Sequence, residues 1–185
     1  MVEASYYLAQ PQQFSMHDFY FNFATNVPVI IASVDYRLAL EHRLPAAYDG
    51  AVEALHWIKT SQDDCLRDYA DLSNCFLLRD YVWLLRAMTF VHSLKIGGLI
   101  LIQQLFGGSR RTSSELRLVN DPILGISVCD LMWDLSLPLG VDRDHEYRNP
   151  MAGGDSNVFD KVKALGWRVL VSGSDGDPLI DVRLS

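Results

Sequence analysis

Short, almost continuously apolar runs alternate with helical patterns along this chain, and this alternation is what most constrains its fold. Residues 27–34 read Val-Pro-Val-Ile-Ile-Ala-Ser-Val, and similar runs occupy 74–78, 96–102 and 167–171. A strand that is covered on both faces has such a run, whereas a strand with one solvated face alternates apolar and polar residues. These runs therefore predict a mainly parallel sheet flanked by helices, which is the α/β class.

Helical patterns stand between the runs. Pro45 suits the first turn of a helix, where its missing N–H costs no hydrogen bond. Behind it, apolar side chains recur at helical spacing and form one stripe, at Tyr48, Ala51, Val52, Leu55 and Ile58. Two further helices are expected, one at 129–137 before Pro138 and one at 155–165 that Gly166 closes.

Composition and length favour one domain over residues 1–185, because 49% hydrophobic residues can bury a single core. The 16 basic and 23 acidic residues give a net charge of −7, and no basic run exceeds Arg110-Arg111. This argues against nucleic acid or an anionic membrane surface as the main partner. The longest apolar stretch, 96–106, is too short to span a bilayer, and residues 1–4 lack a signal-peptide pattern.

The three cysteines, Cys65, Cys75 and Cys129, form no Cys-x-x-Cys pair and cannot all be paired with one another. This usage favours a reduced, cytoplasmic setting. No histidine stands at ligand spacing from them, so we expect buried thiols rather than a metal site. We expect no cofactor either.

Residues 33–49 read Ser-Val-Asp-Tyr-Arg-Leu-Ala-Leu-Glu-His-Arg-Leu-Pro-Ala-Ala-Tyr-Asp. The segment closely resembles a signature of the plant-type carboxylesterases, in the hormone-sensitive-lipase-like branch of the α/β-hydrolase family, although Leu40 stands where that family usually shows proline. The resemblance covers three blocks, 17–78, 94–149 and 166–181. It implies a partial α/β-hydrolase fold that lacks the first three strands, the nucleophile elbow and the last strand. The chemistry it implies is a serine acyl-enzyme mechanism on small acyl or aryl esters.

By this resemblance, one residue of the catalytic machinery remains. Asp177, in an Asp-Pro-Leu sequence, matches the family's triad carboxylate. The base histidine would follow an eighth strand beyond residue 185, and the oxyanion loop would lie at residues 1–5, which contain no glycine. An aspartate with no histidine to orient is better explained as the cap of a turn, so we expect a structural role for Asp177.

The nucleophile should follow the strand that ends at Leu78, on a tight turn flanked by small residues in a Gly-x-Ser-x-Gly pattern. Residues 79–88 contain neither serine nor glycine, and the pattern occurs nowhere in the chain. The resemblance stops abruptly at Arg79 and resumes after Ser93, which favours a frameshifted or mis-spliced interval, or a truncated gene copy, over gradual drift. A transcript that encodes a glycine-flanked serine there would identify the interval as a sequence error.

None of the histidines offers a replacement base. His42 is expected to anchor the loop after a strand, and His56 to be a partly buried imidazole on a helix. His92 and Ser93 are adjacent, and adjacent side chains rarely aim at one reacting atom. His145 lies in a charged run that we expect to be a solvated surface segment.

The family's sheet order places its third strand between the fourth and the fifth. The run at 27–34, as the fourth strand, would then lack the neighbour that connects it to residues 76–78. Each buried backbone group left unpaired costs about 1–3 kcal/mol. We therefore expect local order in the part of the sheet from Cys75 to Val171.

Three functions remain open at this point. The first is a carboxylic-ester hydrolase by descent whose chain is inactive. The second is non-catalytic binding of a small hormone-like ligand, as in the gibberellin receptor that this family resembles. The third is an interaction role in which exposed sheet edges pair with an intact paralogue. An ester-hydrolysis assay separates the first from the others, ligand-dependent thermal stabilisation separates the second from the third, and the oligomeric state is open in all three.

Overall fold

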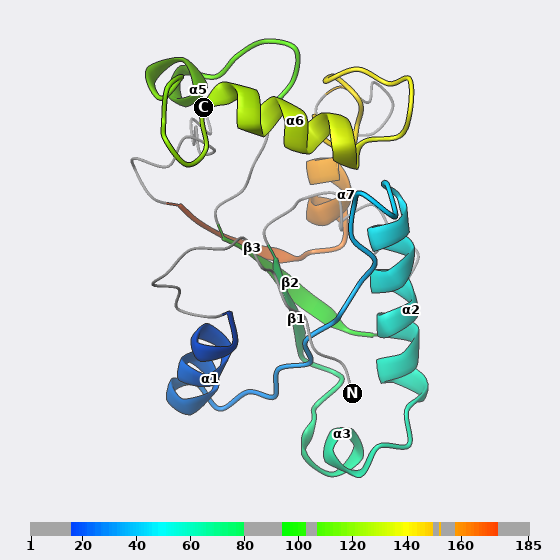
Figure 1. Ribbon diagram of the computed structural model, residues 1–185. Helices are drawn as coiled ribbons and strands as arrows, with labels where there is room; N and C mark the ends of the chain where they lie inside the picture. Colours follow the sequence, from blue (N-terminus) through cyan, green and yellow to red (C-terminus); the bar gives the residue numbers. More distant parts are fainter. Residues whose placement is uncertain (1–15, 80–93, 103–106, 150–151, 153–157, 174–185) are drawn as a thin grey trace.

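The computed structural model describes residues 16–79, 94–102, 107–149, 152 and 158–173 (Figure 1). A small central sheet carries helices around it. The elements follow in the order α1 (Met16–Asn26), α2 (Ala46–Thr60), α3 (Asp64–Tyr69), β1 (Cys75–Arg79), β2 (Ile96–Ile102), α5 (Ser113–Arg117), α6 (Ile126–Ser136), α7 (Val158–Ala164) and β3 (Arg168–Ser172).

The sheet has three parallel strands in the order β1-β2-β3. Leu99 of β2 is the register partner of Leu77 on one side and of Val169 on the other. The predictions of strands at 74–78, 96–102 and 167–171 are confirmed, as is the α/β class. The expected order between Cys75 and Val171 thus takes the form of one central strand with two parallel neighbours.

Gly97 and Gly98, near the start of β2, have different structural roles. The register with β1 shifts so that Cys75 pairs with Ile96 and Phe76 with Gly98, which leaves Gly97 as the extra residue of a bulge. A Cβ on Gly98 would lie 2.4 Å from the carbonyl oxygen of Arg168, closer than any side chain tolerates. Gly98 is therefore required for β3 to approach β2.

Side chains of β2 join two buried clusters that share the partly buried Leu77 and Trp167. Ile96 packs with Ala51 and Leu55 of α2, and Leu99 and Leu101 pack with Val162 of α7. Because of the bulge at Gly97, Ile96 and Leu99 pair with Cys75 and Leu77, which are two residues apart in β1, so both clusters lie on the same face of the sheet. Residues 100 and 102, which point to the opposite face, are half-buried.

Helix α2 begins directly after Pro45, as predicted, and buries one stripe against the sheet. The buried residues are Ala47, Tyr48, Ala51 and Leu55, whereas Val52 and Ile58 of the predicted stripe are half-buried. Helix α6 also matches its prediction but begins three residues earlier, at Ile126. Helix α7 and the left-handed Gly166 (φ +68°) confirm the last predicted helix over 158–165, and residues 155–157 lie outside the described residues.

The prediction of a buried strand at residues 27–34 is wrong. No strand is assigned there, and Val27, Val29 and Ile30 are exposed by 38%, 42% and 41%. Within the described residues β1 pairs with β2 alone, so the run has no strand beside it. Backbone N–H and C=O groups without a partner strand must stay in contact with water, which explains why an apolar run remains at the surface.

Three short helices were not predicted, α1, α3 and α5. Helices α3 and α5 begin at side-chain caps, and α1 contains an aromatic pair. Asp63 caps α3 by accepting hydrogen bonds from the N–H groups of Cys65 and Leu66 at 2.9 and 3.1 Å. In α1, the rings of Phe19 and Phe23 stack four residues apart.

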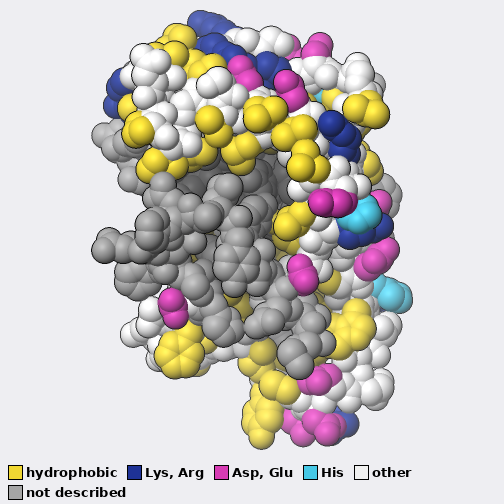
Figure 2. All heavy atoms as spheres, viewed as in Figure 1, with side chains coloured by type: hydrophobic (Ala, Val, Ile, Leu, Met, Phe, Trp, Pro, Cys, Tyr) yellow, Lys and Arg dark blue, Asp and Glu magenta, His cyan; other side chains and the backbone are white. Residues whose placement is uncertain are grey.

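Apolar side chains remain exposed on the layer that α5 and α6 form above the sheet in Figure 1, and Figure 2 shows them gathered along its border. Val128 and Leu131 of α6 are 42% and 57% exposed, while Cys129 and Trp133 on the other face of the helix are buried. Helix α6 is therefore apolar on two faces. No helix in the described part of the chain is long and apolar enough to cross a membrane.

We predict that replacing Gly98 with alanine lowers the free energy of unfolding by about 1–3 kcal/mol, because the new Cβ forces β3 away from β2. Gly97→Ala is the matched control, since the nearest atom to its Cβ would be Cζ of Phe76, at an ordinary contact distance of 3.6 Å. Urea denaturation of the two variants measures the difference. Equal stability of the two variants would contradict the role assigned to Gly98.

Candidate functional site

The carboxyl ends of the three strands meet at one edge of the sheet. Arg79 of β1 is in register with Leu101, and Ile102 is in register with Ser172 of β3. The segments that follow the three strands therefore all begin at this edge. Open parallel sheets bind their ligands outside the carboxyl ends of the strands, so this edge is the candidate functional site.

The residues that the sequence predicted for catalysis lie outside the described residues. Asp177 follows the last residue of β3 by five positions in the sequence, and the segment expected to hold the nucleophile, 80–93, directly follows β1. The expected oxyanion loop at residues 1–5 and the pair His92 and Ser93 are outside them as well. What the structure describes is the scaffold that surrounds this edge.

The segment after β2 is held by the loop that follows α6. The N–H of Gly107 donates to the carbonyl oxygen of Arg148 at 3.5 Å, and the N–H of Ser109 donates to Oδ1 of Asp144 at 2.8 Å. Hydrogen bonds from the side chain and the N–H of Ser109, and from Asn149, hold the pKa of Asp144 below its ordinary value. Asp144 therefore stays ionised and fixes the backbone as it leaves the sheet edge.

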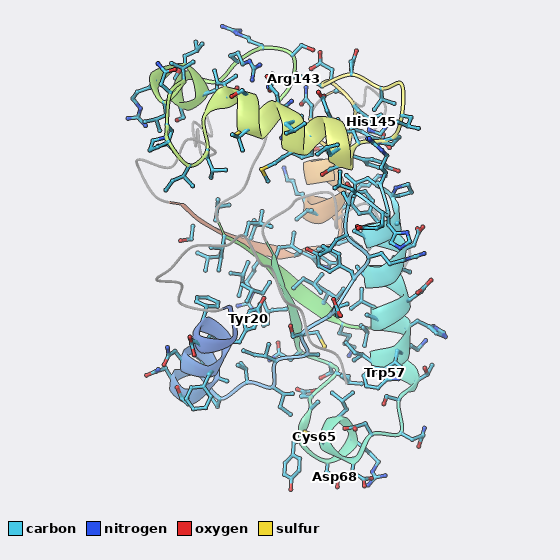
Figure 3. The ribbon with its side chains drawn as sticks, in the orientation of Figure 1. Tyr20, Trp57, Cys65, Asp68, Arg143 and His145 are labelled. Atoms are coloured by element: carbon cyan, nitrogen blue, oxygen red, sulfur yellow. The ribbon has the colours of Figure 1, made fainter. Side chains whose placement is uncertain are left out.

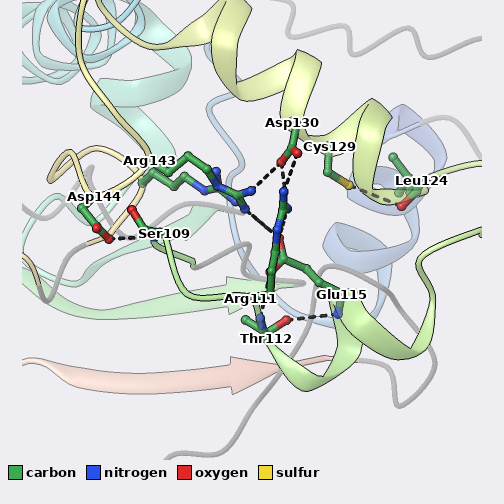
Figure 4. A network of polar contacts seen from close by, with 10 residues as sticks. Ser109, Arg111, Thr112, Glu115, Leu124, Cys129, Asp130, Arg143 and Asp144 are labelled. Carbon is green, nitrogen blue, oxygen red and sulfur yellow. Dashed lines mark hydrogen bonds and ion pairs between the residues drawn. The ribbon is translucent and has the colours of Figure 1, made fainter.

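A cluster of ion pairs lies between α5, α6 and this loop (Figure 4). We call it the Glu115 cluster, and it consists of Arg111, Glu115, Asp130, Arg143 and Arg148. Oε1 of Glu115 lies 3.2 Å from Arg111, 3.0 Å from Arg143 and 3.4 Å from Arg148. Asp130 pairs with Arg111 at 2.5 Å and with Arg143 at 2.7 Å. Glu115 and Arg148 are buried, whereas Arg111, Arg143 and Asp130 are partly exposed, so the cluster is dry on the Glu115 side and reaches water on the Asp130 side.

Local sequence places Glu115 at the centre of this cluster. Its N–H donates to Oγ1 of Thr112 at 3.1 Å, while its Oε2 accepts from the N–H of Thr112 at 2.8 Å. This reciprocal arrangement is a capping box, which fixes the first turn of α5. The same carboxylate thus caps a helix with one oxygen and holds three arginines with the other.

The pKa values of the cluster follow from its contacts. The hydrogen bond from Arg111 is the main reason that the pKa of Asp130 is lowered, and the same bond raises the pKa of Arg111. Burial is the main reason that the pKa of Arg148 falls to about 10. All three groups are therefore charged at neutral pH.

The 33–49 segment is bound to the same layer. The Nη1 of Arg43 donates to the carbonyl oxygen of Asp134 and, at 2.7 Å, to that of Leu137, and the N–H of Leu44 donates to Ser136 at 2.8 Å. These carbonyls end α6, where they have no partner within the helix. The guanidinium of Arg43 thus joins the start of α2 to the end of α6.

Several sequence interpretations need correction. His56 is exposed rather than partly buried, because it projects from α2 away from the buried stripe. His42 is also exposed; its N–H donates to the carbonyl oxygen of Leu38 at 2.9 Å within the loop, whose contact with the end of α6 comes from the neighbouring Arg43. Cys65 is exposed and Cys75 is half-buried, so of the expected buried thiols only Cys129 is buried. Figure 3 shows Cys65 on α3, at the end of the molecule opposite Arg143.

The charged run around His145 is not a simple solvated surface segment. Arg143 is 20% exposed because it reaches the two carboxylates of the Glu115 cluster. The ring of His145 lies 4.5 Å from that of Tyr147, which in turn contacts the buried Tyr48 at 4.7 Å. Contacts with distant elements therefore partly bury Arg143 and His145, whereas Asp142 and Asp144 of the same run remain exposed as expected.

The sequence interpretation missed the Glu115 cluster. The spacing of Thr112 and Glu115 is that of a capping box, and this signal could have identified the helix start and its carboxylate. No local pattern marks Arg143 and Arg148, which reach Glu115 from 28 and 33 residues away. Among the described residues, no group of three or more histidine, cysteine or acidic side chains could hold a metal ion.

Comparisons with known proteins agree on one family. A family model described as alpha/beta hydrolase fold matches residues 5–184. Carboxylesterase 20 of Arabidopsis thaliana is 48% identical over 177 residues, which cover 90% of this chain and 54% of that protein. The 3-O-acetylpapaveroxine carboxylesterase CXE2 of Papaver somniferum is 43% identical over 180 residues, which cover 89% of this chain and 58% of that protein.

More distant similarities include a receptor and a solved esterase structure. Gibberellin receptor GID1B of Arabidopsis thaliana is 36% identical over 130 residues, covering 66% of this chain and 35% of the receptor. The Pyrobaculum calidifontis esterase superposes with a TM-score of 0.64 at 18% identity, over 83% of this chain and 59% of that structure. The chain thus spans little more than half the length of the carboxylesterases that it matches.

We predict that Glu115→Gln lowers the free energy of unfolding by about 3–5 kcal/mol, because one carboxylate would then face three arginines in a buried setting. Glutamine preserves the capping box, so the loss would report the charge. Glu53→Gln, on the exposed face of α2, is the control and should change stability by less than about 0.5 kcal/mol. Similar denaturation midpoints for the two variants would contradict this account.

Proposed function

Because the chain belongs to the alpha/beta hydrolase fold family and its relatives include plant carboxylesterases, we propose that its sheet edge derives from a carboxylic-ester hydrolase. The observation that carries the proposal is the common edge at which β1, β2 and β3 end. The segments that the resemblance assigns to the nucleophile and to the acid begin at this edge. Small acyl or aryl esters are the proposed substrate class of the complete enzyme.

The chemistry of such a site is acyl transfer in two steps. A serine oxygen attacks the ester carbonyl and forms an acyl-enzyme, and the alcohol leaves with a proton that a histidine supplies. Water then attacks the acyl-enzyme, with the same histidine as the base. A carboxylate orients that histidine, and Asp177 is the residue that we propose for this position, by resemblance.

We further propose that this chain does not itself form an acyl-enzyme. The segment after β1 contains no glycine between residues 79 and 93, and Gly-x-Ser-x-Gly is absent from the whole sequence. A nucleophile elbow is a strained turn that large side chains cannot enter, and Tyr81, Val82 and Trp83 occupy the expected place. We propose that the chain forms one domain with a degenerate active site. A cytoplasmic setting is part of the proposal, and the three free cysteines support it.

Non-catalytic ligand binding is the second candidate, and the similarity to the gibberellin receptors supports it. A receptor needs a pocket at the same sheet edge but no nucleophile. The two candidates therefore differ in turnover and not in location. Saturable thermal stabilisation by a gibberellin, without ester turnover, would favour the second candidate.

We predict that the purified chain hydrolyses 4-nitrophenyl acetate no faster than buffer and forms no adduct with a fluorophosphonate probe, because it has no activated serine. Arabidopsis Carboxylesterase 20, assayed in parallel, is the positive control. Intact-mass spectrometry detects the adduct directly. A stoichiometric adduct would contradict the proposal of inactivity, and loss of turnover in Asp177→Asn would then identify Asp177 as part of the machinery.

A further inference from the structure

The Glu115 cluster contains one positive charge more than it neutralises. Three arginines, Arg111, Arg143 and Arg148, face two carboxylates, those of Glu115 and Asp130. The difference of three cations and two anions is +1. Outside the cluster, the carboxylate of Asp144 is also attracted to Arg148, which contributes to its lowered pKa. Asp144 is exposed, however, and its Oδ1 accepts hydrogen bonds from Ser109 and Asn149 at 2.8 and 3.2 Å, so water screens its charge from the cluster.

The excess charge is located at Arg148. This side chain is 1% exposed, and its ion pair with Glu115, at 3.4 Å, is the longest of the three contacts to that oxygen. Its Nε and Nη1 are buried and have no hydrogen-bond partner among the described residues. Asp130 and Glu115 already bind Arg111 and Arg143 at shorter distances, so neither satisfies these two N–H-bearing atoms.

Apart from Glu115, the groups that we can place beside Arg148 are donors or apolar surfaces. The Cζ of Arg148 lies 5.2 Å from the centre of the Trp133 ring, whose buried Nε1 also has no hydrogen-bond partner in the described part of the chain. Nε of Arg143 is a further buried donor without a partner there. On another side stands Gly107, where a Cβ would lie 3.4 Å from Nη2 and 3.7 Å from Nε of Arg148. The orphaned atoms are thus all donors, in a site that carries a net positive charge.

We propose that a small monovalent anion of halide size binds at Arg148, between α6 and Gly107. Unpaired buried donors on a cation require an acceptor, and a negative charge also cancels the excess of the cluster. A water molecule would supply an acceptor but would leave the charge uncompensated. Because the N–H of Gly107 donates to the carbonyl oxygen of Arg148, the anion would also stabilise the backbone at Gly107, five residues after the end of β2.

The test uses the full chain at constant ionic strength, with sodium bromide or sodium chloride replacing sodium gluconate, whose anion is too large for the site. Bromide quenches tryptophan, so binding beside Trp133 should add a saturable component to the fluorescence quenching. At a chloride concentration ten times the dissociation constant, the melting temperature should rise by about 3–6 °C. Strictly linear quenching in the unaltered chain, with no chloride-dependent shift, would overturn the proposal and leave water as the occupant.

Matched variants assign the effect to one arginine. Arg148→Met keeps much of the side-chain volume and removes the charge, so both the saturable quenching and the chloride shift should disappear. Arg110→Met removes an exposed arginine from the neighbouring segment and should retain both. Equal responses of the two variants would overturn the assignment to Arg148. If Arg148→Met does not fold, the bromide titration of the unaltered chain decides the question alone.

Discussion

The pairing of β2 with a parallel strand on each side is the interaction on which the rest of the described structure depends. Ile96 packs in the cluster with α2, and Leu99 and Leu101 pack in the cluster with α7, so one strand supports both helices from the same face of the sheet. The absence of a side chain at Gly98 permits the approach of β3. The edge that holds the candidate site exists because the three strands end in register.

A second set of contacts, which is polar, organises the layer beyond the sheet edge. The Glu115 cluster ties α5 to α6 and to the loop that carries Arg143 and Arg148. Arg43 then binds the end of α6 to the start of α2. The family signature at residues 33–49 thus has a structural reason that is independent of catalysis, because it connects a helix of the core to the layer above the site.

The sequence predicted those elements whose evidence is local. Buried strands such as β2 and the stripe of α2 are visible in the residues themselves, because burial on two faces or on one face leaves a pattern. The run at residues 27–34 has the same pattern and does not form a strand, because a strand also needs a neighbour that the run cannot specify. The pairing of Arg148 with Glu115 depends on the path of the chain over 33 residues, so no local sequence motif predicts it.

The sequence identified Asp177 by resemblance alone, and the structure describes the strands at the sheet edge but not Asp177 itself. A complete active site would require all of its residues to lie together at that edge. The central claim is that order is concentrated in the three-stranded sheet and that residues 27–34 do not join it. Amide hydrogen exchange followed by mass spectrometry tests this most directly. We predict strong protection of peptides that cover residues 96–102 and rapid exchange over residues 27–34. Equal protection of the two segments would show that a strand forms there and would contradict the account.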